Sequence, residues 1–116
     1  MQKVAGIGGL FFRAQAPDTL KQWYADTLGV ALTPDWHQQA GPTVFEPFAA
    51  DTTYFGRESQ AWMVNFRVAD LAGMVAQLRA AGVTVADPQE YPPAGWFARL
   101  HDPEGNPIEL WQPPTD

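Results

Sequence analysis

The sequence predicts an α+β fold made of two tandem βαβββ modules, whose strands form one curled mixed sheet with a concave cup on one face and helices on its outer face. Two observations predict this fold. The order of strand-like and helix-like segments in the first half is repeated in the second. Short segments also correspond, since Phe12–Ala14 matches Phe66–Val68 and Leu28–Val30 matches Ala81–Val83.

The length of the chain predicts how the two modules combine. A chain of 116 residues is one domain at roughly 100–200 residues per domain. A module of roughly 55 residues buries too little surface to be stable alone. We therefore expect a single domain over residues 1–116, with a first module over about 1–58 and a second over about 59–116.

The first module opens with a β-prone segment over Val4–Ala14, which predicts a strand. Pro17 suits the first turn of a helix and Gly29 its C-terminal end. Between them, residues recur at the spacing of one helical face: Leu20, Trp23, Tyr24, Thr27 and Leu28. Further strands are predicted over 30–32, 43–46 and 52–55, with an interruption at 33–35 and a stop at Pro47.

The second module has clearer signals. A strand is predicted over Ala61–Val68, where large apolar residues alternate with Met63, Asn65 and Arg67. Asp70 suits the N-cap of a helix that Gly82 ends. The segments that follow are a strand over 83–86, a proline-containing loop over 87–94, a strand over 96–100, a turn over 102–106 and a last strand over 108–111.

Composition excludes several kinds of chemistry. The chain has no cysteine, which excludes disulfides, thiol catalysis and cysteine-based metal centres. Its net charge of −6 and seven Lys and Arg residues argue against a nucleic-acid-binding surface. We see neither a signal peptide nor an apolar run long enough to span a membrane, and we interpret the chain as a cytoplasmic protein without a membrane partner.

Three segments resemble the vicinal oxygen chelate superfamily, the glyoxalase, bleomycin resistance and extradiol dioxygenase group. They are Trp23–Gly29 in the first module, and Asn65–Leu71 and Asp102–Leu110 in the second. The resemblance implies paired βαβββ modules, frequent dimers and a cup that usually holds a divalent metal. Because the sheet rims and the many aromatic residues need cover, we also expect a homodimer.

The resemblance places the family's four metal ligands at Gly9, Glu46, Met63 and Glu109. Gly9 has no side chain, and the thioether of Met63 is a poor ligand for hard cations. Glu46 and Glu109 remain as the ligands of a divalent metal, if one binds, and as candidate catalytic carboxylates. We favour no cofactor and expect each carboxylate to be neutralised by Arg13 or Arg67. We interpret His37 as a loop residue and His101 as a surface or turn residue, and neither as a metal ligand.

Aromatic residues and a few polar ones are expected to line the cup, which suits a planar or apolar ligand. The candidate ligand-binding residues are Phe11, Arg13, Trp36, Phe48, Tyr54, Met63, Asn65, Arg67, Trp96 and Trp111. The segment 51–56 is expected to be a rim loop that closes over a ligand, or only a turn.

The sequence is compatible with three functions. The first is a small-molecule-binding protein of the glyoxalase/bleomycin resistance family, with an aromatic cup and a degenerate metal site. The second is a metal-dependent lyase, isomerase or dioxygenase-like enzyme that uses Glu46 and Glu109. The third is an interaction module without a ligand, whose cup is filled by its own side chains.

Overall fold

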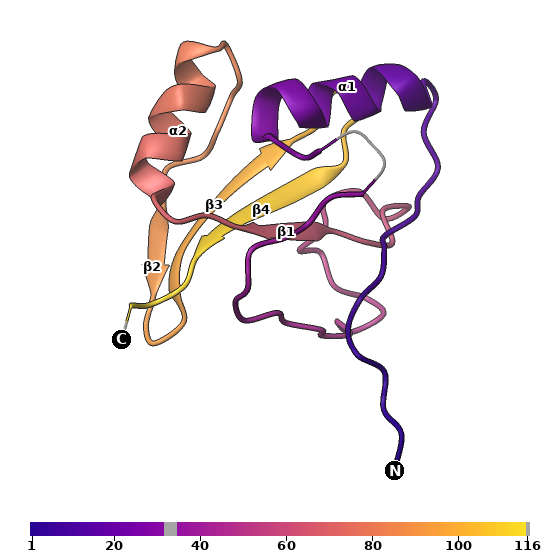
Figure 1. Ribbon diagram of the computed structural model, residues 1–116. Helices are drawn as coiled ribbons and strands as arrows, with labels where there is room; N and C mark the ends of the chain where they lie inside the picture. Colours follow the sequence, from indigo (N-terminus) through magenta and orange to yellow (C-terminus); the bar gives the residue numbers. More distant parts are fainter. Residues whose placement is uncertain (32–34, 116) are drawn as a thin grey trace.

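The computed structural model describes residues 1–31 and 35–115 and confirms the α+β class. Two helices cover one face of a four-stranded sheet in this part of the chain (Figure 1). The elements are α1 (Pro17–Leu28), β1 (Val64–Arg67), α2 (Leu71–Ala80), β2 (Gln89–Tyr91), β3 (Gly95–His101) and β4 (Pro107–Gln112). Neither of these helices is long and apolar enough to cross a membrane.

The sheet is mixed, and its strand order is β1-β4-β3-β2. β1 runs parallel to β4, because α2 and the β2–β3 pair separate these two strands along the chain. The β2–β3 and β3–β4 pairs are antiparallel. Residues 64–112 therefore form a continuous βαβββ unit.

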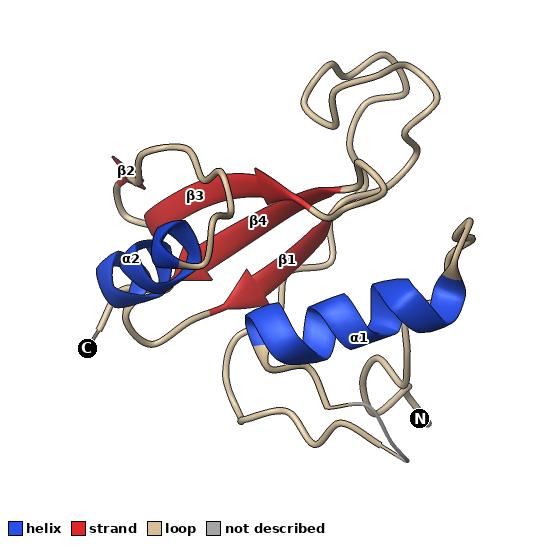
Figure 2. Cartoon of the chain, turned by 90° about the horizontal axis from the view of Figure 1, so that it is seen from above, coloured by secondary structure: helices blue, strands red, loops and turns tan. Residues whose placement is uncertain are grey.

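The core lies between the sheet and the two helices; in Figure 2 α2 lies over one end of β3 and β4, and α1 lies alongside β1. Ile108 and Leu110 of β4 are completely buried there. The helices contribute buried side chains that include Leu20, Leu71 and Leu78. Burial of apolar side chains of this size contributes about 1.5–3 kcal/mol each.

Helix α1 has the predicted proline start and glycine end, and Gly29 adopts the left-handed conformation with a φ of 76°. Its N-terminus is capped from a distant part of the chain. The Glu104 carboxylate accepts hydrogen bonds from the backbone N–H groups of Gln15 and Ala16, at 2.7 and 3.1 Å. The predicted turn over 102–106 therefore also anchors α1. The negative charge of Glu104 is favourable there, because the N-terminus of a helix carries a partial positive charge.

Helix α2 begins as predicted. The Asp70 side chain accepts a hydrogen bond from the backbone N–H of Gly73 at 3.0 Å, as an N-cap residue does. The helix ends at Ala80, and the turn that follows contains Gly82, whose φ of 85° favours glycine.

Several predicted strands of the first module do not form in the structure. Residues 4–14 and 43–46 contain no strand, and residues 52–55 contain turns. Residues 30 and 31 contain no strand either, and the rest of the strand predicted over 30–32, with most of its interruption at 33–35, lies outside the described residues. In Figure 1 the N-terminal segment extends away from the sheet. β-propensity alone does not produce a strand, because each strand needs a hydrogen-bonded neighbour.

The strand predicted over 83–86 is also wrong, and a short strand forms at 89–91 instead. The backbone N–H of Val83 bonds to Leu78 at the end of α2, so this residue completes the helix rather than a sheet. Val85 nevertheless packs in the core, as its apolar character predicts.

Alternation along the strands separates two faces of the sheet. Val64 and Phe66 pack toward the helices with Ala98, Leu100, Ile108 and Leu110. The residues between them lie on the opposite face, which we call the cup face. It is formed by Asn65, Arg67, Phe97, Arg99, Glu109 and Trp111.

Candidate functional site

Strand register places the cup-face residues in two rows across the sheet. Asn65, Glu109 and Arg99 form one row, because β1 and β3 both pair with β4 at Glu109. Arg67, Trp111 and Phe97 form the neighbouring row in the same way. One row is therefore polar and the other is mainly aromatic.

Glu109 is the centre of a hydrogen-bonded cluster. Its Oε1 accepts a bond from Nδ2 of Asn65 at 2.8 Å. Its Oε2 accepts a short bond from the hydroxyl group of Tyr54, a residue of the loop before β1. Uncharged donors thus hold both carboxylate oxygens, whereas the sequence predicted neutralisation by Arg13 or Arg67. That expectation is wrong for Glu109, and the guanidinium of Arg67 instead donates to the Gln39 carbonyl at 3.2 Å.

Arg99 braces Tyr54 from the sheet. Its Nη1 donates to the backbone carbonyl of Tyr54 at 2.8 Å, and its guanidinium carbon lies 4.6 Å from the centroid of the Tyr54 ring. This arrangement is a cation–π contact. The Nε of Arg99 is buried without a hydrogen-bond partner among the described residues. An unpaired buried donor is unfavourable, so an oxygen atom placed beside it would be stabilising.

The environment of Tyr54 affects the ionisation of its hydroxyl group. Burial raises the pKa of Tyr54, and the hydrogen bond to Glu109 and the charge of that carboxylate raise it further. Arg99 acts in the opposite direction on this pKa but does not reverse it. Tyr54 therefore remains a neutral hydrogen-bond donor toward Glu109 through the physiological pH range.

Aromatic rings surround this polar cluster. The rings of Phe97 and Trp111 are nearly parallel, at 7° and 6.2 Å between centroids. The indole N–H of Trp111 donates to the Ala94 carbonyl at 2.8 Å, which fixes the orientation of its ring. Phe48 stacks on Tyr54 at 24° and 5.8 Å. Such a surface suits a flat ligand with few polar groups.

The structure brings some of the predicted site residues together. Tyr54 and Asn65 contact Glu109 directly, while Phe48, Arg67 and Trp111 lie next to them through ring stacking or strand register. Met63 comes just before β1 and is half-buried.

Other predicted site residues lie elsewhere. Phe11 and Arg13 are exposed on the N-terminal segment. The Trp36 ring contacts Phe66, which is a helix-side residue, at 6.0 Å between centroids. Glu46 is exposed, and no hydrogen bond or ion pair connects it to Glu109 in the part of the chain that the structure describes.

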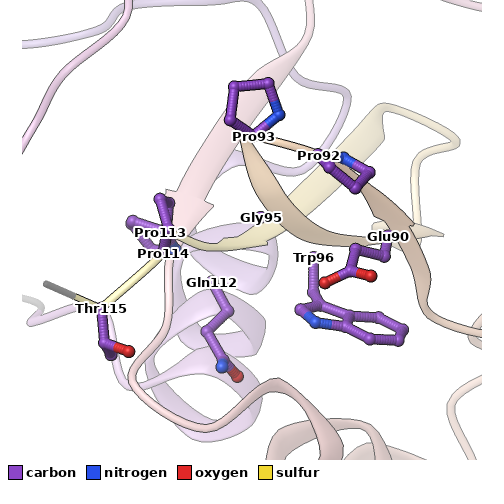
Figure 3. A pocket seen from close by; sticks show the side chains of 9 residues that line it. All are labelled: Glu90, Pro92, Pro93, Gly95, Trp96, Gln112, Pro113, Pro114 and Thr115. Carbon is purple, nitrogen blue, oxygen red and sulfur yellow. The ribbon is translucent and has the colours of Figure 1, made fainter.

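Trp96 is separated from the cup face by strand alternation. It alternates in step with Ala98 and Leu100, so its side chain lies on the same face of β3 as these two residues, which pack under the helices. Trp96 lines an open hollow of about 450 Å³ near the C-terminal end, with Glu90, Pro92, Pro93, Gly95, Gln112, Pro113, Pro114 and Thr115. In Figure 3 the side chains of Trp96 and Gln112 extend to the same side of the paired strands. Neither Tyr54 nor Glu109 lines this hollow.

The residues at the four expected metal-ligand positions do not fit a hard divalent cation. Gly9 supplies no donor, Met63 supplies a thioether, and Glu46 is not gathered with Glu109. Both oxygens of Glu109 already accept hydrogen bonds. Within residues 1–31 and 35–115, no group of three or more His, Asp or Glu side chains is close enough to hold a metal ion.

Two residues of the cup face, Phe97 and Arg99, are absent from the sequence-based site. Alternation in the predicted strand over 96–100 would have placed them opposite Ala98 and Leu100. The sequence does not say which alternate residues of this strand face the helices. Contacts with α2 decide this, because they place Ala98 and Leu100 in the core.

The fold and the cup face define a small α+β protein whose curled sheet carries a polar centre and aromatic surroundings. A family model described as a glyoxalase-like domain matches residues 9–111. The chain therefore belongs to the glyoxalase-like family, within the vicinal oxygen chelate superfamily that the sequence motifs indicate. No curated protein matches the chain.

Solved structures share the fold over most of the chain. TnmS3, an antibiotic binding protein from Streptomyces sp. CB03234, is 24% identical with a TM-score of 0.70, and the match covers 98% of this chain and 100% of that one. A glyoxalase/bleomycin resistance protein from the same Streptomyces strain is 27% identical with a TM-score of 0.56, covering 84% and 92%. Lactoylglutathione lyase from Agrobacterium tumefaciens is 16% identical with a TM-score of 0.60, covering 95% of each chain.

Proposed function

We propose that this protein binds a small, planar organic molecule on the cup face and has a degenerate metal site. The observation that carries this proposal is the cluster of Tyr54, Asn65 and Glu109 beside the stacked Phe97 and Trp111. One carboxylate with fixed donors supplies directional hydrogen bonding, and the rings supply apolar contact area. Two structural relatives are in line with binding as a role, since one is an antibiotic binding protein and another a glyoxalase/bleomycin resistance protein.

Fluorescence of the tryptophans tests the proposal, because Trp111 is part of the cup face. We expect a saturable change when the protein is titrated with a panel of planar aromatic and cationic compounds. Glu109→Gln should weaken the binding of compounds that donate hydrogen bonds, whereas Glu58→Gln, at an exposed loop position, should not. Absence of a saturable response across the whole panel would contradict the proposal.

A metal-dependent lyase, isomerase or dioxygenase-like activity is the second candidate. It rests on the family resemblance alone, which places Glu46 and Glu109 at two metal-ligand positions, whereas the structure does not bring these two side chains together. Metal analysis of protein purified without chelators discriminates between the two functions. Stoichiometric metal that is lost in Glu109→Gln would support the enzyme. The third candidate, an interaction module, would show neither metal nor a response to small molecules.

We further propose a homodimer. Apolar side chains of the first half are strongly exposed in the single chain, including Val4 at 92%, Phe11 at 93% and Phe45 at 85%. An extended, apolar segment of this kind is stabilised when a sheet edge or a second apolar surface covers it. A second copy of the chain supplies both, because it carries the same β1 edge and the same exposed segments. A cytoplasmic location stays a prediction.

A further inference from the structure

The loop over residues 48–56 covers the polar centre of the cup face; we call it the Tyr54 loop. It consists of two successive turns, closed by backbone bonds from Thr52 to Ala49 and from Gly56 to Thr53. These bonds lie within the loop, so they hold its shape and not its position. Two hydrogen bonds connect the loop to the sheet within the described residues, and both involve Tyr54.

The surroundings of the Tyr54 side chain amount to a binding site for a phenol. Glu109 accepts the bond from the hydroxyl group, and Asn65 holds the carboxylate from the other side. The Arg99 guanidinium lies against the ring at 4.6 Å, and Phe48 stacks on it at 5.8 Å. Each contact recognises a feature that any hydroxylated aromatic ring has, and none requires the tyrosine backbone.

The closed arrangement is also incompletely satisfied. The buried Nε of Arg99 lacks a partner among the described residues, which destabilises the closed state relative to one that pairs this group. Tyr54 is 41% exposed, so the residue is not enclosed by the rest of the chain. A single side chain with one exposed side is easier to displace than a packed core residue.

We propose that Tyr54 is an internal ligand, and that the protein binds a planar aromatic molecule carrying a hydroxyl group, which takes the place of Tyr54 when the loop moves away. This inference rests on the proposed small-molecule function and specifies the ligand class. Because the closed loop competes with the ligand, the apparent affinity of the intact protein equals the intrinsic affinity reduced by the fraction of open molecules.

Chemical complementation tests the inference with a probe that matches the missing side chain. Tyr54→Ala removes the internal ligand, and 4-methylphenol is the side chain of tyrosine as a free molecule. We expect 4-methylphenol to bind Tyr54→Ala at least about tenfold more tightly than the intact protein, as measured by calorimetry, because the competing side chain is absent. Toluene, which lacks the hydroxyl group, should bind the variant about tenfold more weakly than 4-methylphenol, because it cannot donate to a carboxylate.

Two further variants keep the result interpretable. Tyr54→Phe retains the ring and loses only the donor to Glu109, so it serves if Tyr54→Ala does not fold; its affinity for 4-methylphenol should exceed that of the intact protein. Glu109→Gln, combined with either variant, should remove most of the preference for 4-methylphenol over toluene. Equal affinity in the intact protein and the Tyr54 variants, or equal affinity for the two probes, would overturn the inference.

The failure of this inference is distinguishable from failure of the proposed function. Planar compounds that bind regardless of their hydroxyl group and of residue 54 would leave the proposed function intact and overturn the internal-ligand role. A panel without any response from the intact protein would contradict the proposed function. It would also overturn the displacement of Tyr54 by a ligand, even if Tyr54→Ala bound 4-methylphenol.

Discussion

Tyr24 and Asp102 form a buried polar pair that joins α1 to the turn between β3 and β4. The Tyr24 hydroxyl donates to Oδ2 of Asp102 at 2.7 Å, and the side-chain amide of Asn106 donates to the same oxygen at 2.7 Å. The other oxygen, Oδ1, accepts backbone bonds from Glu104 and Asn106. One buried carboxylate therefore organises both the turn and its contact with the helix.

Substitution of Tyr24 by phenylalanine tests the strength of this contact. Tyr24→Phe leaves the ring in the core and removes the donor to Asp102. We expect a loss of about 1–3 kcal/mol in the free energy of unfolding, because a buried charged acceptor loses one of its partners. Urea unfolding measures this change. A loss below about 0.5 kcal/mol would mean that the hydroxyl group does not stabilise the turn.

Stability at alkaline pH should also depend on Tyr24. Burial raises the pKa of Tyr24 above its ordinary value of 10.0, and Asp102 raises it further through the hydrogen bond and its charge. The folded protein thus holds this proton more tightly than the unfolded chain. The contribution of Tyr24 to the free energy of unfolding is therefore fully present below pH 10. It falls as the pH rises above 10.

Unfolding of wild type and Tyr24→Phe at pH 8, 9.5 and 10.5 measures this dependence. The decline above pH 10 should be smaller in the variant, although Tyr54 contributes to it in both proteins. Identical declines in the two proteins would contradict the assignment to Tyr24.

At the scale of the elements, the start of β3 depends on a residue without a side chain. Gly95 has a φ of 114°, and a Cβ atom there would lie 2.3 Å from the backbone oxygen of Gln112 on β4. The contact is with backbone and not with a movable side chain. Any other residue would therefore have to displace the strand or change its backbone conformation.

Gly95→Ala should destabilise the protein more than Gly82→Ala does. Gly82 also has a positive φ, but a Cβ atom at that position would meet nothing within 4 Å. We expect about 1 kcal/mol from conformation alone at Gly82, and a larger loss at Gly95 because of the added clash. Thermal unfolding of the two variants makes the comparison. Equal losses would show that β4 accommodates the side chain.

The whole molecule combines a well-packed second half with an exposed first half. Residues 64–112 contain all the strands of the described chain, whereas α1 is the one regular element of the described residues before them. The exposed apolar residues concentrate in the same first half. This asymmetry underlies the homodimer that we propose.

The mass in solution tests the dimer. At micromolar concentration we expect twice the chain mass of 12.8 kDa. Phe45→Glu should weaken association, because it places a charge on an 85% exposed apolar residue of the first half. Tyr91→Glu is the control, since Tyr91 is exposed on β2 in the second half. A monomeric mass for wild type would contradict the proposal.

Local sequence signals predicted most of the second half, although not the strand at 89–91. The Asp70 cap, the turn over 102–106 and the alternation around Asn65 and Glu109 are short-range patterns, and the structure contains all three. The first half shows the limit of such signals. Val4–Ala14 has the composition of a strand, but none of the described residues pairs with it in a sheet.

The α+β class and the assignment of Asn65 and Glu109 to the cup follow from the sequence, because periodicity and turn chemistry act between near neighbours along the chain. The family follows from the resemblance of three short segments. The position of Tyr54 over Glu109, 55 residues away, required the tertiary structure, as did the bracing by Arg99 and the separation of Trp96 from the cup face. Contacts between distant segments depend on how the loop folds back and on which face of each strand the helices cover. Local sequence patterns contain no information about either.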